Sequence, residues 1–326
     1  SSSSGGIGNP ISSGETREAD VKSKSNNLGL FTELEYKPTP ELKVIPGLRA
    51  DYFSITKESF VLPRLAAQYK ASDSLIYKMG SGMYVQSAEP QESSPDLGNG
   101  DIKSPQAVHF ALGFDKDFKE GKTEGHFFGM NGFYKKFNDL VVSSNKKVIR
   151  NGIETFEVYN NEGSGASYGV ENQWKYQNDD MQIILSYTWS KSTRQNPKDG
   201  EYNFEYDQTH NLNLIGIYPL ANDWKISGRY RYVTGNPYTP VVGSTYDADN
   251  ETYFPVRGVI YSQRNNPFQQ LDFRIDKKII LDEETWTIYL DIQNVLNIKN
   301  SEGVQYSYDY KIKQDVTGLP LLPSIG

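Results

Sequence analysis

Few residues of this 326-residue chain have the types and spacing that chemistry at a protein site requires. The three histidines, His109, His126 and His210, lie far apart in the sequence, and no closely spaced set of metal ligands occurs. Cysteine is absent, which excludes disulfides and thiolate metal sites. No Gly-x-Ser-x-Gly motif occurs, which weakens a hydrolase hypothesis. The sequence therefore predicts no catalytic residue, no bound metal and no cofactor.

Three short segments are weaker candidates for a site. Asp207 and His210 lie close together where a long loop meets a predicted strand, and we interpret them as structural. The acidic segment 247–251 spaces oxygen ligands like part of a calcium loop, but it lacks the glycine at the sixth position and the distal glutamate. We interpret it as a solvated loop. The glycine-rich segment 163–169 is too irregular for a phosphate cradle, and it predicts a flexible loop.

Segments in which apolar and polar residues alternate predict strands, and such strands would hold the polar residues in position. The clearest of these segments is Gln269–Asn300. It contains two runs joined by a tight turn at 282–284, and each run is about ten residues long, which is the length a tilted strand needs to cross a bilayer. The apolar residues that share one face are Leu271, Phe273, Ile275, Trp286, Ile288, Leu290 and Ile292. In a soluble sandwich this face would point into a core, and in a membrane barrel it would point to lipid.

The composition favours the membrane barrel. Mean hydropathy is −0.63 and no run of 18 apolar residues occurs, which excludes helical membrane spans but not strands, because a strand needs only every second residue to be apolar. The 23 Tyr, 15 Phe and 4 Trp residues suit the aromatic girdles at the membrane interfaces. A net charge of −7 without a basic run argues against a nucleic-acid partner.

The same alternation predicts twelve strands along the chain and the start of a thirteenth at Pro323. The predicted strands are 28–37, 48–52, 61–70, 75–86, 108–114, 126–137, 168–176, 183–189, 208–218, 224–232, 271–279 and 286–295. Residues 1–27 are rich in serine and glycine and predict a flexible or disordered segment, so that residues 28–326 form the barrel portion. Long loops are predicted at about 87–104, 138–163, 191–206, 235–266 and 297–322.

Short turns and long loops fall at opposite ends of the predicted strands. Outer-membrane barrels show this asymmetry, with short periplasmic turns and long outer loops, whereas a soluble all-β protein has no reason to adopt it. Thirteen antiparallel strands that begin and end in the same direction cannot close without a parallel seam. An open edge in lipid would leave backbone groups unpaired. The fold class that we predict is therefore all-β, an antiparallel transmembrane β-barrel portion of about 12–13 strands from a larger barrel.

Several stretches resemble the C-terminal barrel of TonB-dependent outer-membrane transporters. They are LDFRIDKKI (271–279), YLDIQNVLN (289–297), YDQTHNLNLIGIY (206–218), GRYRYVTGNPYTP (228–240), LGLFTELEYKP (28–38), PGLRADYF (46–53) and LPRLAAQYK (62–70). The resemblance implies a location in the bacterial outer membrane and a barrel of about 22 strands around a plug domain. This sequence contains no plug, no TonB-interacting segment, no first nine strands and no terminal aromatic residue, so we expect it to be part of a longer protein.

Two groups of residues are candidates for contacts inside such a barrel. Polar residues on the face opposite to lipid either contact the plug or line a path for the substrate, and they are Glu33, Glu35, Arg49, Asp51, Arg64, Gln68, Glu171, Arg229, Arg231, Asp272, Arg274 and Asp291. Aromatic residues of the long loops either stack on an incoming ligand or pack among the loops, and they are Tyr202, Phe204, Tyr206, Tyr238 and Tyr246.

The leading hypothesis for function is TonB-dependent active import of a scarce nutrient, a ferric siderophore or a corrinoid. The resemblance implies that outer loops and plug capture the ligand, and that the TonB complex, driven by the proton gradient, acts on the plug. The implied partners are outer-membrane lipid, the plug and remaining strands, the TonB complex and a small-molecule ligand. One alternative is a passive porin-like channel or a receptor or adhesion barrel without TonB coupling. Another is an outer-membrane hydrolase with a Ser–His pair that includes His210.

Overall fold

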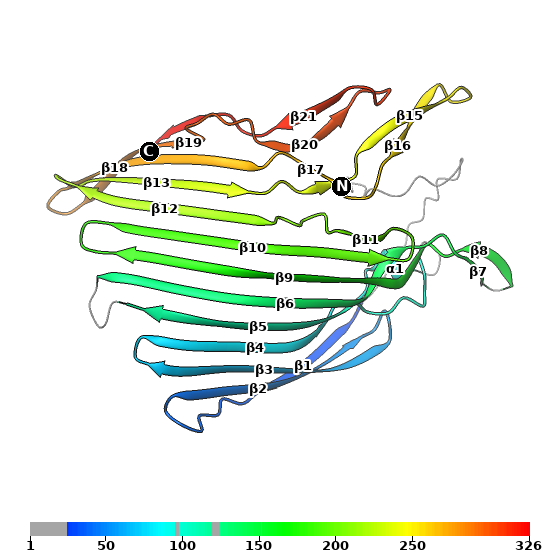
Figure 1. Cartoon of the computed structure of the whole chain (residues 1–326), viewed down its shortest axis with the longest axis horizontal. Coiled ribbons are helices and arrows are strands. Elements are labelled where there is room, and N and C mark those ends of the chain that lie inside the picture. Colours follow the sequence, from blue (N-terminus) through cyan, green and yellow to red (C-terminus); the bar gives the residue numbers. More distant parts are fainter. Residues whose placement is uncertain (1–24, 95–97, 119–123, 151) are drawn as a thin grey trace.

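One large antiparallel sheet dominates the computed structural model, which describes residues 25–94, 98–118, 124–150 and 152–326. Thirteen strands follow one another in chain order across it (Figure 1). They are β1 (Asn27–Glu33), β2 (Leu42–Phe53), β3 (Glu58–Ser72), β4 (Leu75–Val85), β5 (Gln106–Asp117), β6 (Gly125–Ser143), β9 (Tyr159–Gln177), β10 (Gln182–Asn196), β12 (His210–Leu220), β13 (Trp224–Val233), β18 (Phe268–Ile280), β19 (Thr285–Gln293) and β22 (Leu322–Ile325).

The all-β antiparallel prediction is confirmed. Every pair of neighbouring strands in the sheet is antiparallel, and within the described ranges β1 and β22 are the two edges, each paired on one side only. The one helix of these ranges is α1 (Pro90–Ser93), a single turn. None of the described helical residues forms a helix long and apolar enough to span a membrane. The predicted flexible segment up to residue 24 and the turn around residue 121 lie outside the described residues.

The two ends of the sheet differ in their connections, as Figure 1 shows. At one end neighbouring strands are joined by the short turns 73–74, 178–181, 221–223 and 281–284. At the other end, the connections 86–105, 144–158, 197–209, 234–267 and 294–321 are long, and 54–57 is the short exception. We call this second end the loop end. The tight turns need only a few residues, whereas the long connections carry secondary structure of their own.

Four small two-stranded sheets and one extra strand occupy the loop end. They are β7 (Lys147–Arg150) with β8 (Ile153–Phe156), β14 (Pro237–Tyr238) with β17 (Gln263–Arg264), β15 (Val241–Asp247) with β16 (Thr252–Arg257), β20 (Ser301–Tyr306) with β21 (Lys313–Thr317), and β11 (Gly200–Asn203), which pairs with β10. The strands β6, β9 and β10 also run further than the alternation predicts. Much of the predicted loops 138–163 and 191–206 is therefore paired backbone.

The prediction of a flexible loop at 163–169 was wrong. This segment lies in β9 and pairs with β6 on one side and β10 on the other. At Gly165 a Cβ would lie 2.6 Å from the Thr193 backbone oxygen and 2.8 Å from Arg194 Cδ. Glycine is present here because neighbouring groups approach the backbone closely, and not because the chain is mobile.

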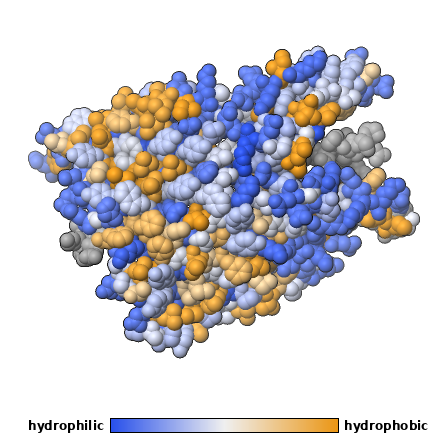
Figure 2. All heavy atoms as spheres, in the orientation of Figure 1, coloured by the Kyte–Doolittle hydropathy of each residue, from blue (hydrophilic) through white to orange (hydrophobic). Residues whose placement is uncertain are grey.

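The strand registers divide the sheet into a polar face and an apolar face. The buried residues of the main strands, Asp51, Phe53, Leu62, Val233, Asp272 and Asp276, all lie on the polar face. On the apolar face large side chains remain exposed, for example Ile288 at 51% and Trp286 at 57%. Figure 2 shows hydrophobic residues in patches along the strands. Apolar side chains without a protein partner on one face, opposite a polar face, are typical of a wall that separates lipid from a lumen.

Candidate ligand site at the loop end

The polar residues predicted from the sequence to point away from lipid share the polar face of the sheet. The registers place Arg229 opposite Asp272 and Arg274 opposite Asp291, on the face that also carries Asp51. Glu35 lies just beyond β1 and forms ion pairs with two lysines. The strand residues concerned are Glu33, Arg49, Asp51, Arg64, Gln68, Glu171, Arg229, Arg231, Asp272, Arg274 and Asp291.

Most charges of this polar face are neutralised within the protein. Arg49 Nε lies 2.8 Å from Asp51 Oδ2, and Arg229 Nη2 lies 2.7 Å from Asp272 Oδ2. Arg274 pairs in the same way with the buried carboxylate of Asp276, at 2.7 Å. These are charge-assisted hydrogen bonds, which hold the side chains in one arrangement. The polar face therefore combines ordered ion pairs with charges such as Arg64, Arg231 and Asp291, which form no ion pair among the described residues.

The predicted loop aromatics do not form a single cluster. Tyr202 in β11 and Phe204 line the same cavity, and the rings of Phe204 and Tyr206, in the connection between β11 and β12, lie 5.5 Å apart. Tyr238 instead accepts a 2.6 Å hydrogen bond from Lys313, and Tyr246 packs on Tyr253 at 4.9 Å. The three clustered residues line cavities, whereas Tyr238 and Tyr246 contact other parts of the loops.

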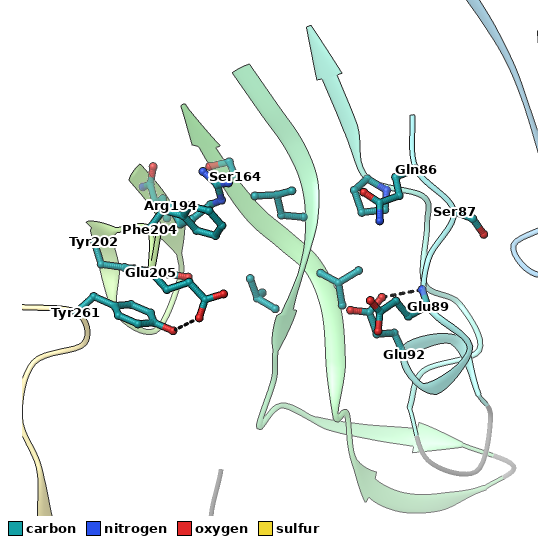
Figure 3. Close-up of a pocket in the computed structure, with 15 residues that line it drawn as sticks. Gln86, Ser87, Glu89, Glu92, Ser164, Arg194, Tyr202, Phe204, Glu205 and Tyr261 are labelled. Carbon is teal, nitrogen blue, oxygen red and sulfur yellow. Dashed lines mark hydrogen bonds between the residues drawn. The ribbon is translucent and has the colours of Figure 1, made fainter. Parts of the chain in front are cut away.

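A cavity of about 380 Å³, which we call the outer cavity, opens among the loops next to this cluster (Figure 3). Its volume is in the range of small-molecule sites, about 300–1,000 Å³. Figure 3 shows one wall formed by Arg194, Tyr202, Phe204, Glu205 and Tyr261, and the opposite wall by residues around α1. The lining residues are Gln86, Ser87, Glu89, Glu92, Pro105, Leu140, Val141, Val142, Ser164, Arg194, Gln195, Tyr202, Phe204, Glu205 and Tyr261.

Arg194 is held between two aromatic rings. Its guanidinium carbon lies 4.5 Å from the centre of the Phe137 ring and 4.0 Å from that of Phe204. Nη1 donates to the Thr193 backbone oxygen at 2.9 Å and to Ser192 Oγ at 3.3 Å. The two cation–π contacts and the hydrogen bonds of Nη1 hold the guanidinium in place, and its remaining N–H groups donate in the plane of the group.

Tyr261 and Glu205 form the next part of the same wall. The Tyr261 hydroxyl donates to Glu205 Oε2 at 3.2 Å, and the Tyr261 ring stacks on Tyr202 at 6.0 Å. Burial, together with the nearby carboxylate of Glu205, raises the pKa of Tyr261 to about 12. The phenol is therefore neutral at physiological pH and acts as a hydrogen-bond donor. It joins the loop before β17 to the connection between β11 and β12.

The opposite wall carries two carboxylates at the start of α1. Glu92 Oε2 accepts the Glu89 backbone N–H at 2.9 Å, and the Glu89 side chain accepts the backbone N–H of Glu92 in return. This capping box fixes both side chains. Burial raises the pKa of Glu92, and the negative charge of Glu89 acts in the same direction. Each carboxylate keeps acceptor positions beyond those used by the cap.

A second cavity of about 430 Å³ lies on the polar face next to the first, and Arg194 and Phe204 line both cavities. We call it the inner cavity. Its other lining residues are mostly hydroxyl and amide side chains: Lys135, Phe137, Ser167, Glu171, Thr188, Ser190, Ser192, Tyr206, Asp207, Gln208 and Asn211. The pair of cavities therefore meets at the stacked guanidinium of Arg194.

Asp207 stabilises the connection that carries Phe204 and Tyr206. Its buried carboxylate accepts the Ser192 backbone N–H at 2.6 Å and interacts with Lys191 Nζ at 3.3 Å and with Arg264 Nη2. His210 has a different partner, because its Nδ1 hydrogen-bonds to the Tyr187 hydroxyl at 2.9 Å. Asp207 and His210 thus act separately, and the geometry gives Asp207 a structural role.

The acidic segment 247–251 forms the turn between β15 and β16. Asp247 Oδ1 accepts the Asp249 N–H at 3.0 Å, and Oδ2 accepts the Asn250 side-chain amide at 2.9 Å. Asp247 thus caps its own turn. Across the part of the chain that the structure describes, no group of three or more His, Asp or Glu side chains is arranged to hold a metal ion.

Sequence reasoning missed Arg194, Glu205, Tyr261, Glu89 and Glu92 as cavity residues. All five lie in or beside segments predicted as loops, where no periodic pattern marks which side chains meet. A sequence signal existed only at the start of α1, where Glu89-Pro90-Gln91-Glu92 combines a cap position with proline and with an acidic residue three positions on.

Comparison with known proteins places this geometry in a family. Residues 1–295 match the family model of the TonB dependent receptor-like β-barrel. The chain is similar to the FrpB iron transporter from Neisseria meningitidis, with 15% identity, a TM-score of 0.64, and coverage of 92% of this chain and 44% of that one. It is also similar to the siderophore receptor PirA from Acinetobacter baumannii, with 15% identity, a TM-score of 0.65, and coverage of 84% of this chain and 42% of that one.

A third similar structure is a mutant of the ferric enterobactin receptor PfeA from Pseudomonas aeruginosa. It has 13% identity and a TM-score of 0.65, over 87% of this chain and 41% of that one. No curated protein sequence matches the chain. The chain spans less than half the length of these three structures, and proteins of this family reside in the outer membrane of Gram-negative bacteria. This chain therefore belongs to the TonB-dependent receptor family and forms an antiparallel portion of its outer-membrane β-barrel.

Proposed function

We propose that this chain forms the wall and outer loops of a transporter that imports a scarce nutrient by TonB-dependent active transport. The observation that carries the proposal is the match of residues 1–295 to the barrel of the TonB-dependent receptor family. Two of the similar structures are by name a ferric enterobactin receptor and a siderophore receptor, which supports a metal chelate as the nutrient, with a corrinoid as the other possibility. The transporter performs no covalent chemistry on its cargo.

In this proposal the two faces of the sheet have different partners. The exposed apolar face contacts lipid, and the paired charges of the polar face contact the plug domain. The ligand first meets the loop end, where the outer cavity provides a small-molecule site. The TonB complex then acts through the plug.

Growth under nutrient limitation tests the proposal. The gene for the intact receptor is deleted in its host, with and without a functional TonB, and growth is followed with iron as the limiting nutrient and, separately, with cobalamin. We expect the receptor to improve growth on one of these nutrients only when TonB is present. Equal growth with and without the receptor on both nutrients would refute the proposed substrate class.

A conductance measurement separates active import from a passive channel. The intact receptor is reconstituted into a planar lipid bilayer, with a known porin as the control. We expect no steady open conductance, because a plug fills the lumen. A stable porin-like conductance, or receptor-dependent growth that persists without TonB, would favour the passive alternative instead.

A further inference from the structure

The charges of the outer cavity lack the ion pairs that several charges of the polar face form. On the polar face the arginines Arg49, Arg229 and Arg274 each pair with an aspartate at 2.7–2.8 Å. In the outer cavity, by contrast, none of Arg194, Glu89 and Glu92 has an oppositely charged partner among the described residues. Arg194 and Glu92 are partly buried, whereas Glu89 is exposed. Partly buried charges without partners are costly for a protein to maintain unless a ligand supplies the counter-charge.

Arg194 supplies the positive side of the cavity. The rings of Phe137 and Phe204 both form cation–π contacts with its guanidinium, and one nitrogen is occupied by Ser192 and the backbone of β10. Within the described ranges Nε and Nη2 donate to no protein group. Two N–H groups in a fixed plane form the geometry that binds a carboxylate through both of its oxygens.

Glu89 and Glu92 supply the negative side, on the opposite wall (Figure 3). The capping box holds the two carboxylates close together, and each keeps free acceptor positions. Two neighbouring carboxylates favour an ammonium group, which has three N–H donors and can serve both of them. A purely anionic ligand would be repelled by this wall, and a purely cationic one by Arg194.

We propose that the outer cavity binds a zwitterionic ligand with the chemistry of a short peptide, with its carboxylate on Arg194 and its ammonium group between Glu89 and Glu92. The apolar part of the cavity, formed by Phe204, Tyr202 and the segment 140–142, contacts the body of the ligand. This inference rests on the proposed TonB-dependent import, and it specifies the charges on the part of the imported ligand that the outer cavity holds.

Calorimetric titration of the intact receptor in detergent tests the charges of the ligand one at a time. The probes are the tripeptide Gly-Phe-Gly, its N-acetylated form, its C-terminal amide and the doubly blocked form. Each single block removes one charge and leaves the rest of the molecule nearly unchanged. We expect each to weaken binding about tenfold or more, because hydrogen bonds to charged groups are the stronger ones.

Variants of the receptor assign each effect to a wall of the cavity. In Arg194→Gln the free acid and its amide should bind equally, while acetylation still weakens binding. In Glu92→Gln, whose amide oxygen can still accept the cap hydrogen bond, the free amine and its acetylated form should bind equally. Arg194→Lys keeps the charge without the planar fork, and it should fall between Arg194→Gln and the wild type.

Two control substitutions remove like charges elsewhere. Lys277→Gln removes a cation that also lies over an aromatic ring, at 5.6 Å from Trp224, outside the outer cavity. Glu283→Gln removes a carboxylate from the short turn 281–284 at the other end of the sheet. Neither should change the affinity for any probe.

The inference is overturned if the four probes bind equally, if none of them binds, or if the charge preference survives both cavity substitutions. Each of these results would leave TonB-dependent uptake intact. Conversely, loss of TonB dependence in the growth experiment with the peptide preference retained would refute the proposed function and keep the zwitterion site.

Discussion

Replacement of Asp207 by alanine should open the loop end locally while the rest of the sheet stays folded. The strand β12 begins at His210, and β11 pairs with β10 only from Thr193 onward, so between these two strands Lys191 and Ser192 of β10 have no strand partner on that side. The Asp207 carboxylate takes the place of the missing strand and accepts the Ser192 N–H at 2.6 Å. It also holds Arg264, and thereby joins two long loops.

The size of the effect follows from these partners. Loss of a hydrogen bond to a charged group costs about 1.5–3 kcal/mol, and an unpaired buried N–H adds to that. Breaking a fully buried ion pair costs about 3–5 kcal/mol, but the side chains of Lys191 and Arg264 are 31% and 27% exposed and can reach water. We therefore expect Asp207→Ala to cost about 3 kcal/mol locally, which corresponds to about a 100-fold increase in opening.

Hydrogen exchange of peptides that cover residues 188–196, read by mass spectrometry, measures this opening. Asp207→Ala should accelerate exchange there about 100-fold, and peptides from β13 should be unchanged. Asp207→Asn keeps a neutral acceptor for the Ser192 N–H, so its effect should be only about tenfold. Unchanged exchange in Asp207→Ala, or equal exchange in the two variants, would refute the role of this carboxylate as a substitute strand partner.

Three further predictions concern other parts of the molecule. A spin label at Ile288, which is 51% exposed on the apolar face, should be accessible to oxygen, and one at Asp291 on the polar face should not; water-like exposure at Ile288 would contradict the membrane orientation. Because the pKa of Tyr261 is raised to about 12, its contribution to stability should be full below pH 10 and be lost between about pH 10 and 12, and absorbance titration of Tyr261→Phe should lack that late phenolate phase. Gly165→Ala places a methyl group 2.6 Å from a backbone oxygen of β10 and should destabilise the loop end by about 1–3 kcal/mol, measured by limited proteolysis, whereas Gly216→Ala, with no atom within 4 Å, should not.

The sequence by itself determined the strands and their two faces. Alternation with a period of two is a local property, because successive side chains of a strand point to opposite sides whatever the partner strand is. Phe273 and Ile288 could therefore be assigned to one face, and Asp272 and Asp291 to the other, before any partner strand was known. Turn residues such as those at 221–223 and 282–284 are local signals of the same kind.

The sequence did not predict how far the strands extend at the loop end. Glycine marks both flexible loops and places where backbones approach closely, so Gly165 could be interpreted either way. Only the pairing of β9 with β6 and β10 shows that its neighbours leave no room for a side chain. The same pairing extends the sheet past the residues that alternate.

The outer cavity was decided by tertiary structure. Phe137 and Phe204 meet on Arg194, and Tyr261 reaches Glu205, although these residues come from different loops and strands. No periodicity links such positions, because contacts among long connections depend on how the connections pack and not on the local backbone. Composition indicates that the loops are polar and aromatic. Which charges remain unpaired, and therefore which ligand the outer cavity can hold, depends on that packing alone.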